Sequence, residues 1–406
     1  MLKENSGVNV VFRVILFTLA GSFLYAMVSG IRNNYGIMLN DIVSHSGISF
    51  TSVSFVLAVG QLIFGAVQPA FGILAAKKGS IYALVIGVIL TVSGMFLLPL
   101  CKSILTLMLC LGFILPAGTG AVAYGVIMGA ISPKIPPKAF SVVSGIVNAS
   151  SGIGNTVMSP IINSLIKTGG LMHGMLMLSI PALLMLPVSV LLGKKPKIVS
   201  DTAAIGQATP KSKQDATGGL FKRAFGSKAY LYLMLGFFTC GFHMALITNH
   251  LPTQFVSYGF SSQAAANAFS IYGITTLVGA ITSGQLCGKR RMKNILGFIY
   301  GLRPITIALF FLLPKTLFVL TAFTALLGLS GSSTVSPVSG IINKTFGAKS
   351  IAALFGFVLF IHQIGGFLGV WLGGVCFSAT GSYTLIWSVD ILLSTAAAGI
   401  SLMIKD

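Results

Sequence analysis

The stretch "GKKPKIVSDTAAIGQATPKSKQDATGGLFKRAFGSKA" (residues 193–229) is the longest polar run of the chain, and apolar segments flank it on both sides. Its Lys, Ser, Thr and Gly content is typical of a solvated linker. Six apolar segments precede it and six follow, each long enough to cross about 30 Å of hydrocarbon as a helix of roughly 20 residues. The sequence therefore predicts an all-α polytopic membrane protein with two six-helix bundles.

The twelve predicted membrane spans are separated by short polar breaks, and the composition agrees with them, since 55% of residues are apolar and only 8% are charged. The predicted spans are 12–39, 50–76, 81–101, 104–131, 139–166, 171–193, 229–257, 262–287, 294–314, 317–342, 350–378 and 383–404. The predicted domains are an N-terminal bundle (1–193), a basic linker (194–228) and a C-terminal bundle (229–406).

The two halves are weakly related in sequence. An offset of 212 residues matches Ser49 with Ser261 and Gly72 with Gly284. Two repeats in the same orientation imply two bundles that face each other, with a binding site between them near the middle of the membrane.

The net charge of +20 is a topology signal rather than a nucleic-acid surface. Of the 26 Lys and Arg residues, 21 fall on one side of the predicted membrane. Only Lys102, Lys167 and Lys315 fall on the other, while Arg32 and Arg303 lie within spans. Because cytoplasmic loops carry the excess of positive charge, both termini are expected in the cytoplasm.

Enzymatic motifs are missing from the sequence. It has no P-loop, its five cysteines lie in or at the ends of apolar spans, and they form no metal-spaced cluster with histidine. We therefore expect no enzyme, no cofactor and no metal, and an ion or substrate gradient as the energy source.

Arg32 stands inside the first apolar span, in "SGIRNNYG" (29–36). Tyr25, Ser29, Arg32 and Gly36 follow helical spacing and share one face. A central arginine costs about 2.5 to 3.5 kcal/mol on insertion scales, so it should face a partner or a wet cavity. Since only six residues of the chain are acidic, a transported anion is its expected counter-charge. The alternative is that Arg32 extends to the outer headgroups.

His243 and His250 share one face of the seventh span with Gln254. That face is expected to look across the cavity at Arg32. Histidine can donate to a carboxylate and carry a proton near neutral pH, which makes His243 and His250 candidates for substrate binding and proton coupling. The alternative is that they cap a helix break near Pro252.

Three further polar residues lie within predicted spans. Tyr124 and Ser333 are candidate substrate-binding residues, although a packing role is the alternative for each. Arg303 directly precedes Pro304 in the ninth span, so we expect it to be mainly structural and to bind a carbonyl that the proline frees.

The segment "GILAAKKGS" (72–80) resembles the loop motif G-x-L-A-D-R-x-G-R of the major facilitator superfamily. Gly72, Lys77 and Gly79 match, Lys78 follows, and Ala76 stands at the aspartate position. The second copy, "GQLCGKRRM" (284–292), also lacks the aspartate. The resemblance implies a gating loop without its acidic latch, so the inward-open state is expected to be easier to populate.

Within this superfamily, "GIRNNYGIML", "GAVQPAFGILA", "GFHMALITNHLPTQF" and "FGFVLFIHQIGGFLGVWLGG" resemble bacterial members near the monocarboxylate and oxalate/formate branch. The resemblance implies a monomeric secondary transporter of a small organic anion in the bacterial inner membrane, working by alternating access. It also implies a substrate-linked cation close to Arg32. The branch's charged pair in the eighth span is missing between Ser262 and Cys287, which leaves symport with protons, exchange and facilitation open.

Two other functions stay open at this stage. A drug or apolar-metabolite exporter would line its cavity with the many Phe and Met, and a non-transporting receptor would share the fold. The sequence determines neither the substrate nor the direction of transport.

Overall fold

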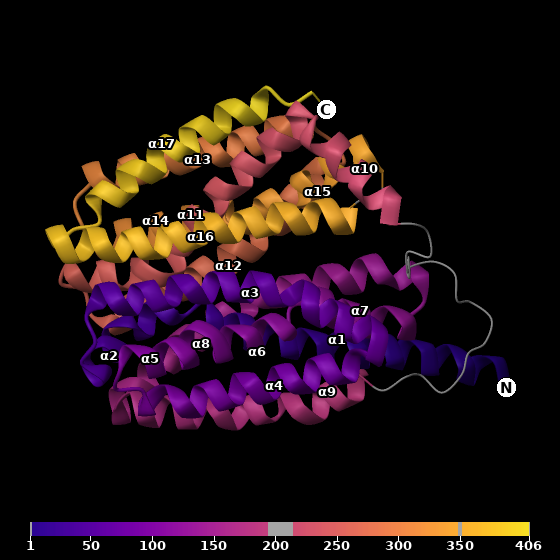
Figure 1. Ribbon diagram of the computed structural model, residues 1–406, viewed down its shortest axis with the longest axis horizontal. Coiled ribbons are helices and arrows are strands. Elements are labelled where there is room, and N and C mark those ends of the chain that lie inside the picture. Colours follow the sequence, from indigo (N-terminus) through magenta and orange to yellow (C-terminus); the bar gives the residue numbers. More distant parts are fainter. Residues whose placement is uncertain (1, 194–213, 348–350, 406) are drawn as a thin grey trace.

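The computed structural model describes residues 2–193, 214–347 and 351–405, and this part of the chain is helical (Figure 1). The N-terminal half contains α1 (Leu2–Arg32), α2 (Tyr35–Ser46), α3 (Phe50–Lys78), α4 (Ser80–Leu97), α5 (Ile104–Leu107), α6 (Leu115–Ala121), α7 (Tyr124–Ile131), α8 (Pro137–Leu183) and α9 (Met185–Gly193). The C-terminal half contains α10 (Gln214–Phe225), α11 (Lys228–Ser257), α12 (Ser262–Cys287), α13 (Met292–Leu312), α14 (Leu317–Ser330), α15 (Val335–Phe346), α16 (Ile351–Thr380) and α17 (Thr384–Leu402).

Eleven helical spans of the described chain are long and apolar enough to cross a membrane, and the longest, Val142–Gly193, has 52 residues. Gly169 and Gly170 interrupt its helix with non-helical backbone, and Gly170 has a φ of +74° that favours glycine. The break divides this span into two and lies between the predicted spans 139–166 and 171–193.

The helices form two bundles that pack against each other (Figure 1). Helices α1–α9 make one bundle and α11–α17 the other, and they meet where α3 packs on α16 and α8 packs on α12. The predicted domain boundaries stay a prediction, because residues 194–213 of the linker lie outside the described residues; α10 falls within its remaining part.

The internal repeat is visible in how two helices begin. The Ser49 side chain caps α3 by accepting from the backbone N–H of Ser52, and Ser261 caps α12 by accepting from Ala264. Ser49 and Ser261 are the pair that the 212-residue offset matches. A serine at this position satisfies a backbone donor that the helix itself cannot pair.

The first predicted span, 12–39, is wrong as one continuous helix. Helix α1 ends at Arg32, and Asn33 and Asn34 form a turn before α2 begins at Tyr35. The Asn34 side chain donates to the backbone oxygen of Gly30 at 2.6 Å. Asparagine competes with the backbone for hydrogen bonds in this way, which ends helices. Arg32 therefore lies at the C-terminal end of a helix, where a positive charge is favourable.

Two further predicted spans are interrupted. The span 104–131 consists of α5, a π-helical segment (Met108–Ile114), α6 and α7. The span 317–342 is broken between α14 and α15 by a 3₁₀ turn (Ser332–Thr334). Gly, Ser, Thr and Pro are frequent at or near both breaks, and these residues weaken a continuous helix.

Several side-chain hydrogen bonds join the two bundles in the described part of the chain. Thr51 of α3 donates to Ser378 of α16 at 2.7 Å, and Asn163 of α8 donates to Gln263 of α12 at 2.8 Å. Thr253 donates to the Gly36 backbone oxygen at 3.3 Å. These contacts lie toward the end that carries α2, at the left of Figure 1.

The opposite end carries exposed cations, and we call it the basic end. Lys77 and Lys78 form the last turn of α3, Lys222 belongs to α10, and all three are exposed. Gly72 is exposed there too, and Gly79 ends α3 with a φ of +110°, a conformation that requires glycine. The side chain of Ala76, at the position of the missing aspartate, lies outside the described residues.

Candidate functional site

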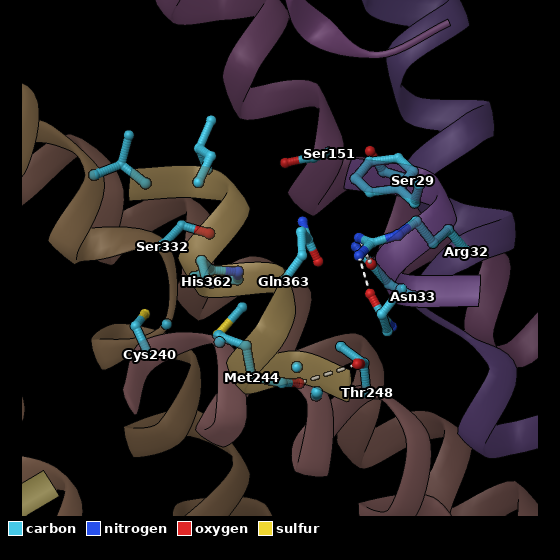
Figure 2. Close-up of a pocket in the computed structure, with 18 of the residues that line it drawn as sticks. Ser29, Arg32, Asn33, Ser151, Cys240, Met244, Thr248, Ser332, His362 and Gln363 are labelled. Atoms are coloured by element: carbon cyan, nitrogen blue, oxygen red, sulfur yellow. Dashed lines mark hydrogen bonds between the residues drawn. The ribbon is translucent and has the colours of Figure 1, made fainter. Parts of the chain in front are cut away.

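A cavity of about 220 Å³ lies between the two bundles (Figure 2). Both bundles contribute to its wall, α1, α3 and α8 from one and α11 and α16 from the other. Its lining residues are Tyr25, Val28, Ser29, Arg32, Asn33, Gln61, Phe64, Ala123, Ser151, Phe237, Cys240, Gly241, Met244, Ala245, Thr248, Gly331, Ser332, Thr334, Val335, Leu359, His362, Gln363 and Gly366. In membrane proteins built from two repeats, binding sites lie at the interface between the repeats near the middle of the membrane, which makes this cavity the candidate site.

Arg32 supplies the positive charge of the cavity. Its Nη2 donates to the side-chain oxygen of Gln61, its Nη1 donates to Asn33 Oδ1 at 3.2 Å, and its guanidinium lies 3.8 Å from the centroid of the Phe64 ring. No Asp or Glu lines the cavity in the described part of the chain. Asn33 in turn donates to Asn155 of α8 at 3.2 Å. The guanidinium is thus held by neutral partners, and its charge is not cancelled.

The opposite wall is formed by α16. Figure 2 shows His362 and Gln363 entering the cavity from the C-terminal bundle, with Gln363 facing Arg32. Phe237, Met244 and Leu359 make neighbouring parts of the wall apolar. One cation, a few hydrogen-bonding groups and apolar surroundings suit a small molecule that carries both a charged and an apolar part.

The structure places the predicted face of the first helix at this cavity. Tyr25, Ser29 and Arg32 all line it. Tyr124 does not: its ring packs 5.7 Å from that of Tyr25, and its hydroxyl is hydrogen-bonded to Ser144. It therefore supports Tyr25 from behind. Arg32 lies in the cavity wall. It does not extend to the end of the molecule that carries α2, as the alternative of a contact with the outer headgroups requires.

His243 and His250 do not line the cavity, although their shared face was expected to look toward Arg32. Both are fully buried in the C-terminal bundle. His243 Nδ1 contacts Asp390 Oδ2 at 2.5 Å. His250 Nε2 lies 2.8 Å from the Val370 backbone oxygen. The expected rotation of α11 is wrong, because the helix presents Cys240, not the histidines, to the cavity.

Ser333 is buried beside the cavity and not in its lining. Its hydroxyl donates to the backbone oxygen of Leu329 at 2.6 Å, a bond back to the last turn of α14. Its neighbours Ser332 and Thr334 line the cavity instead. The 3₁₀ turn rotates the segment, which a continuous helical wheel does not anticipate.

Arg303 is fully buried inside the C-terminal bundle. Its Nη2 donates to the Ser330 backbone oxygen at 2.9 Å and to the Cys240 sulfur at 3.3 Å. The expected binding of a carbonyl holds, but the carbonyl belongs to the break after α14 and not to the proline next to Arg303.

Sequence reasoning missed several lining residues. Gln61 and Phe64 hold Arg32, yet neither was a candidate, although a glutamine in an apolar span is a usable signal. The sequence favours interhelical hydrogen bonds for His362 and Gln363, with His362 also among the groups that could carry a proton within the membrane. Cys240 lies in an apolar span like the other cysteines, and no pattern in the sequence distinguishes it from them.

Two bundles of six membrane-crossing helices around a central cavity define a transporter fold. The chain belongs to the Major Facilitator Superfamily, whose family model matches residues 18–370. It is therefore a multi-pass membrane transporter, and the predicted resemblance to this superfamily is confirmed.

The relatives differ in how much of the chain they match. The "Uncharacterized MFS-type transporter YcxA" of Bacillus subtilis is 33% identical over 42% of this chain and 43% of that protein, less than half of its length. "Monocarboxylate transporter 11" of Mus musculus is 24% identical over 87% of this chain and 79% of that protein. "Monocarboxylate transporter 13" of Bos taurus is 22% identical over 95% and 88%.

Solved structures share the fold at low identity. A bacterial homolog of the human lysosomal transporter Spinster, in an inward-facing and unoccupied conformation, superposes with a TM-score of 0.76 at 15% identity, covering 97% of both chains. A point mutant of the nucleoside transporter NupG superposes with a TM-score of 0.78 at 15% identity, covering 96% of this chain and all of that one. These likenesses concern the fold.

Proposed function

We propose that this transporter moves a small organic anion of the monocarboxylate kind by alternating access, with Arg32 as the group that binds the carboxylate. One observation carries the proposal: a guanidinium in the central cavity is held by Gln61, Asn33 and Phe64, and all three are neutral. Weak similarity to monocarboxylate transporters over most of the chain supports the same substrate class.

The geometry suits a carboxylate. A guanidinium has five N–H donors, and the contacts with Gln61 and Asn33 use two of them. The remaining donors allow a bidentate contact with a planar anion. Ser29 and Tyr25, one and two turns earlier on α1, add hydroxyl groups to the same wall, and the apolar wall around Phe237 and Met244 receives the alkyl part.

The molecule's orientation follows from its charges. We infer that the basic end faces the cytoplasm of a bacterium, since loops on that side hold the excess of Lys and Arg. The hydrogen bonds between the bundles then close the outer side, and the described conformation is the inward-facing one. The absence of the aspartate at Ala76 supports a preference for the inward-facing conformation. Ala76→Asp should therefore shorten the distance between the basic ends of α3 and α12, as in the closed state. Paired spin labels on the two helices measure this distance.

Uptake of labelled lactate, oxalate and related acids into proteoliposomes tests the proposed function. Arg32→Ala should abolish transport while membrane insertion is unchanged, and Arg32→Lys should keep only part of it, because lysine lacks the planar fork. Arg13→Ala is a matched control, since Arg13 lies on the same helix and is exposed. Full uptake by Arg32→Ala would refute the proposal.

The same assay separates the alternatives. Extrusion of apolar compounds without organic-acid uptake would identify an exporter. Binding of an acid without flux would identify a receptor.

A further inference from the structure

The C-terminal bundle contains a buried ionisable pair behind the substrate cavity. His243 of α11 and Asp390 of α17 are both 0% exposed, and Nδ1 of the histidine lies 2.5 Å from Oδ2 of the aspartate. Ionisable groups in membrane-spanning segments are costly, so they are retained mainly where they pair or function. Neither residue touches the cavity, so substrate binding does not explain the pair.

A third buried charge lies in the same bundle. Arg303 of α13 is also 0% exposed; it forms no ion pair with Asp390 among the described residues, but its positive charge acts on that carboxylate at longer range. Its guanidinium reaches the cavity wall from behind, where Nη2 contacts the sulfur of Cys240 at 3.3 Å and the backbone oxygen of Gly331 at 3.4 Å. Cys240 and Gly331 both line the cavity. One layer of atoms therefore separates this cluster from the substrate site.

The cluster has more hydrogen-bonding capacity than its packing uses. His243 Nε2, Asp390 Oδ1, and Nε and Nη1 of Arg303 are buried and have no hydrogen-bond partner among the described residues. Unpaired buried polar atoms cost free energy, and a purely structural cluster is expected to pair them. Such atoms suit a site whose protonation changes during the transport cycle.

The charges of the cluster explain how a proton would be linked to an anion. When His243 is neutral, the charges of Arg303 and Asp390 sum to zero. One added proton, shared between the imidazole of His243 and the carboxylate of Asp390, gives the cluster a net charge of +1. A net charge in a low-dielectric interior is unfavourable unless an opposite charge is near. An anion in the cavity supplies it, so proton and anion binding favour each other.

We propose that the His243–Asp390 pair, with Arg303, is the proton-binding site that couples organic-anion transport to the proton gradient; this rests on the proposed function. The proton comes from water and returns to it, and no other bond changes. The other titratable groups of this region surround Arg303 rather than the pair itself: Cys240 of α11, Tyr272 of α12 and Tyr300 of α13 interact with Arg303, and His362 of α16 interacts with Cys240. His250 is separate, because Val370 and Tyr383 hold it.

Trp387 makes the proton site directly measurable. Its ring lies 6.2 Å from the ring of His243 in an edge-on contact, and the chain has only one other tryptophan, Trp371. Protonated imidazole quenches indole fluorescence. The purified Trp371→Phe protein should therefore lose emission in one step when the pH is lowered and the pair takes up its proton.

Two variants assign that step. His243→Gln in the Trp371→Phe background should remove it, and the control His250→Gln should keep it. A featureless titration of the Trp371→Phe protein, or a step that survives in His243→Gln, would overturn the proposal without any transport measurement.

Transport supplies the second readout. A pH difference of one unit can drive about a tenfold accumulation through a symporter of one proton and one anion. The double variant His243→Gln/Asp390→Asn, which replaces the pair with neutral amides, should lose this accumulation but still exchange labelled for unlabelled acid. Full accumulation by the double variant would refute the coupling role.

The two proposals fail in different ways. If the wild-type protein exchanges no organic acid, the proposed function fails, while the fluorescence step still reports on the proton site. If it exchanges acid but no fluorescence step occurs, the proton site fails alone.

Discussion

The two arginines within the membrane occupy opposite environments. Arg32 is half-buried at the end of α1, lines the cavity and is held by neutral side chains. Arg303 is fully buried in the middle of α13, where it contacts backbone oxygens and lies near the buried Asp390. The same residue type thus supplies an available charge in one place and a compensated charge in the other. What distinguishes them is whether the protein itself provides the anion.

Removal of the compensated charge should have the largest effect. Arg303→Met removes the positive charge that acts on the buried Asp390, and it takes a donor from the buried backbone oxygens of Ser330 and Gly331, where each polar atom left unpaired costs about 1 to 3 kcal/mol. We expect a marked fall in the melting temperature of the detergent-purified protein. Arg32→Met should cost clearly less, because Arg32 is only half-buried and its partners are neutral, so no acid is left behind.

A second change tests the cause of that loss. Adding Asp390→Asn to Arg303→Met removes the stranded carboxylate and should restore part of the stability. Equal melting temperatures for Arg303→Met and Arg32→Met would contradict the comparison.

A carboxylate introduced next to Arg32 should compensate its charge within the protein. Gln61→Glu places a carboxylate where the glutamine oxygen now accepts from Nη2. Because this internal anion competes with the substrate, we expect KM to rise about 100-fold, equivalent to about 2.8 kcal/mol. Initial rates of acid uptake over a range of concentrations measure it.

Gln68→Glu is the matched control for that charge. Gln68 lies on the same helix, outside the cavity lining, and its side chain donates to the Phe64 backbone oxygen. An equal rise in KM for both variants would show that any negative charge on α3 impairs transport, against a specific pairing with Arg32.

The aromatic contact of Arg32 should have the smallest effect. Phe64→Leu keeps an apolar side chain but removes the ring beneath the guanidinium, a contact worth about 0.5 to 1 kcal/mol when partly exposed. We expect KM to change about two- to fivefold, with Phe71→Leu on the same helix as the control. An unchanged KM would mean that Gln61 and Asn33 alone position the guanidinium.

The sequence by itself determined the number and order of the membrane segments. Hydropathy acts on each segment separately, so the break at Gly169–Gly170 and the start of α12 after Ser261 agree with predictions made from local composition and spacing. The scarcity of acidic residues likewise indicated that Arg32 has no carboxylate partner within the protein.

Only the tertiary structure decided which way each helix faces. Most of these helices are apolar all around, so no strong polar stripe fixes their rotation, and small-residue packing sets it instead. On α11, Gly241 lies directly against His362 of α16, and this close approach turns Cys240 to the cavity and His243 toward Asp390. The partners of Arg32 on α3 and of His243 on α17 come from segments far apart in the chain, so only the packed bundles bring them together.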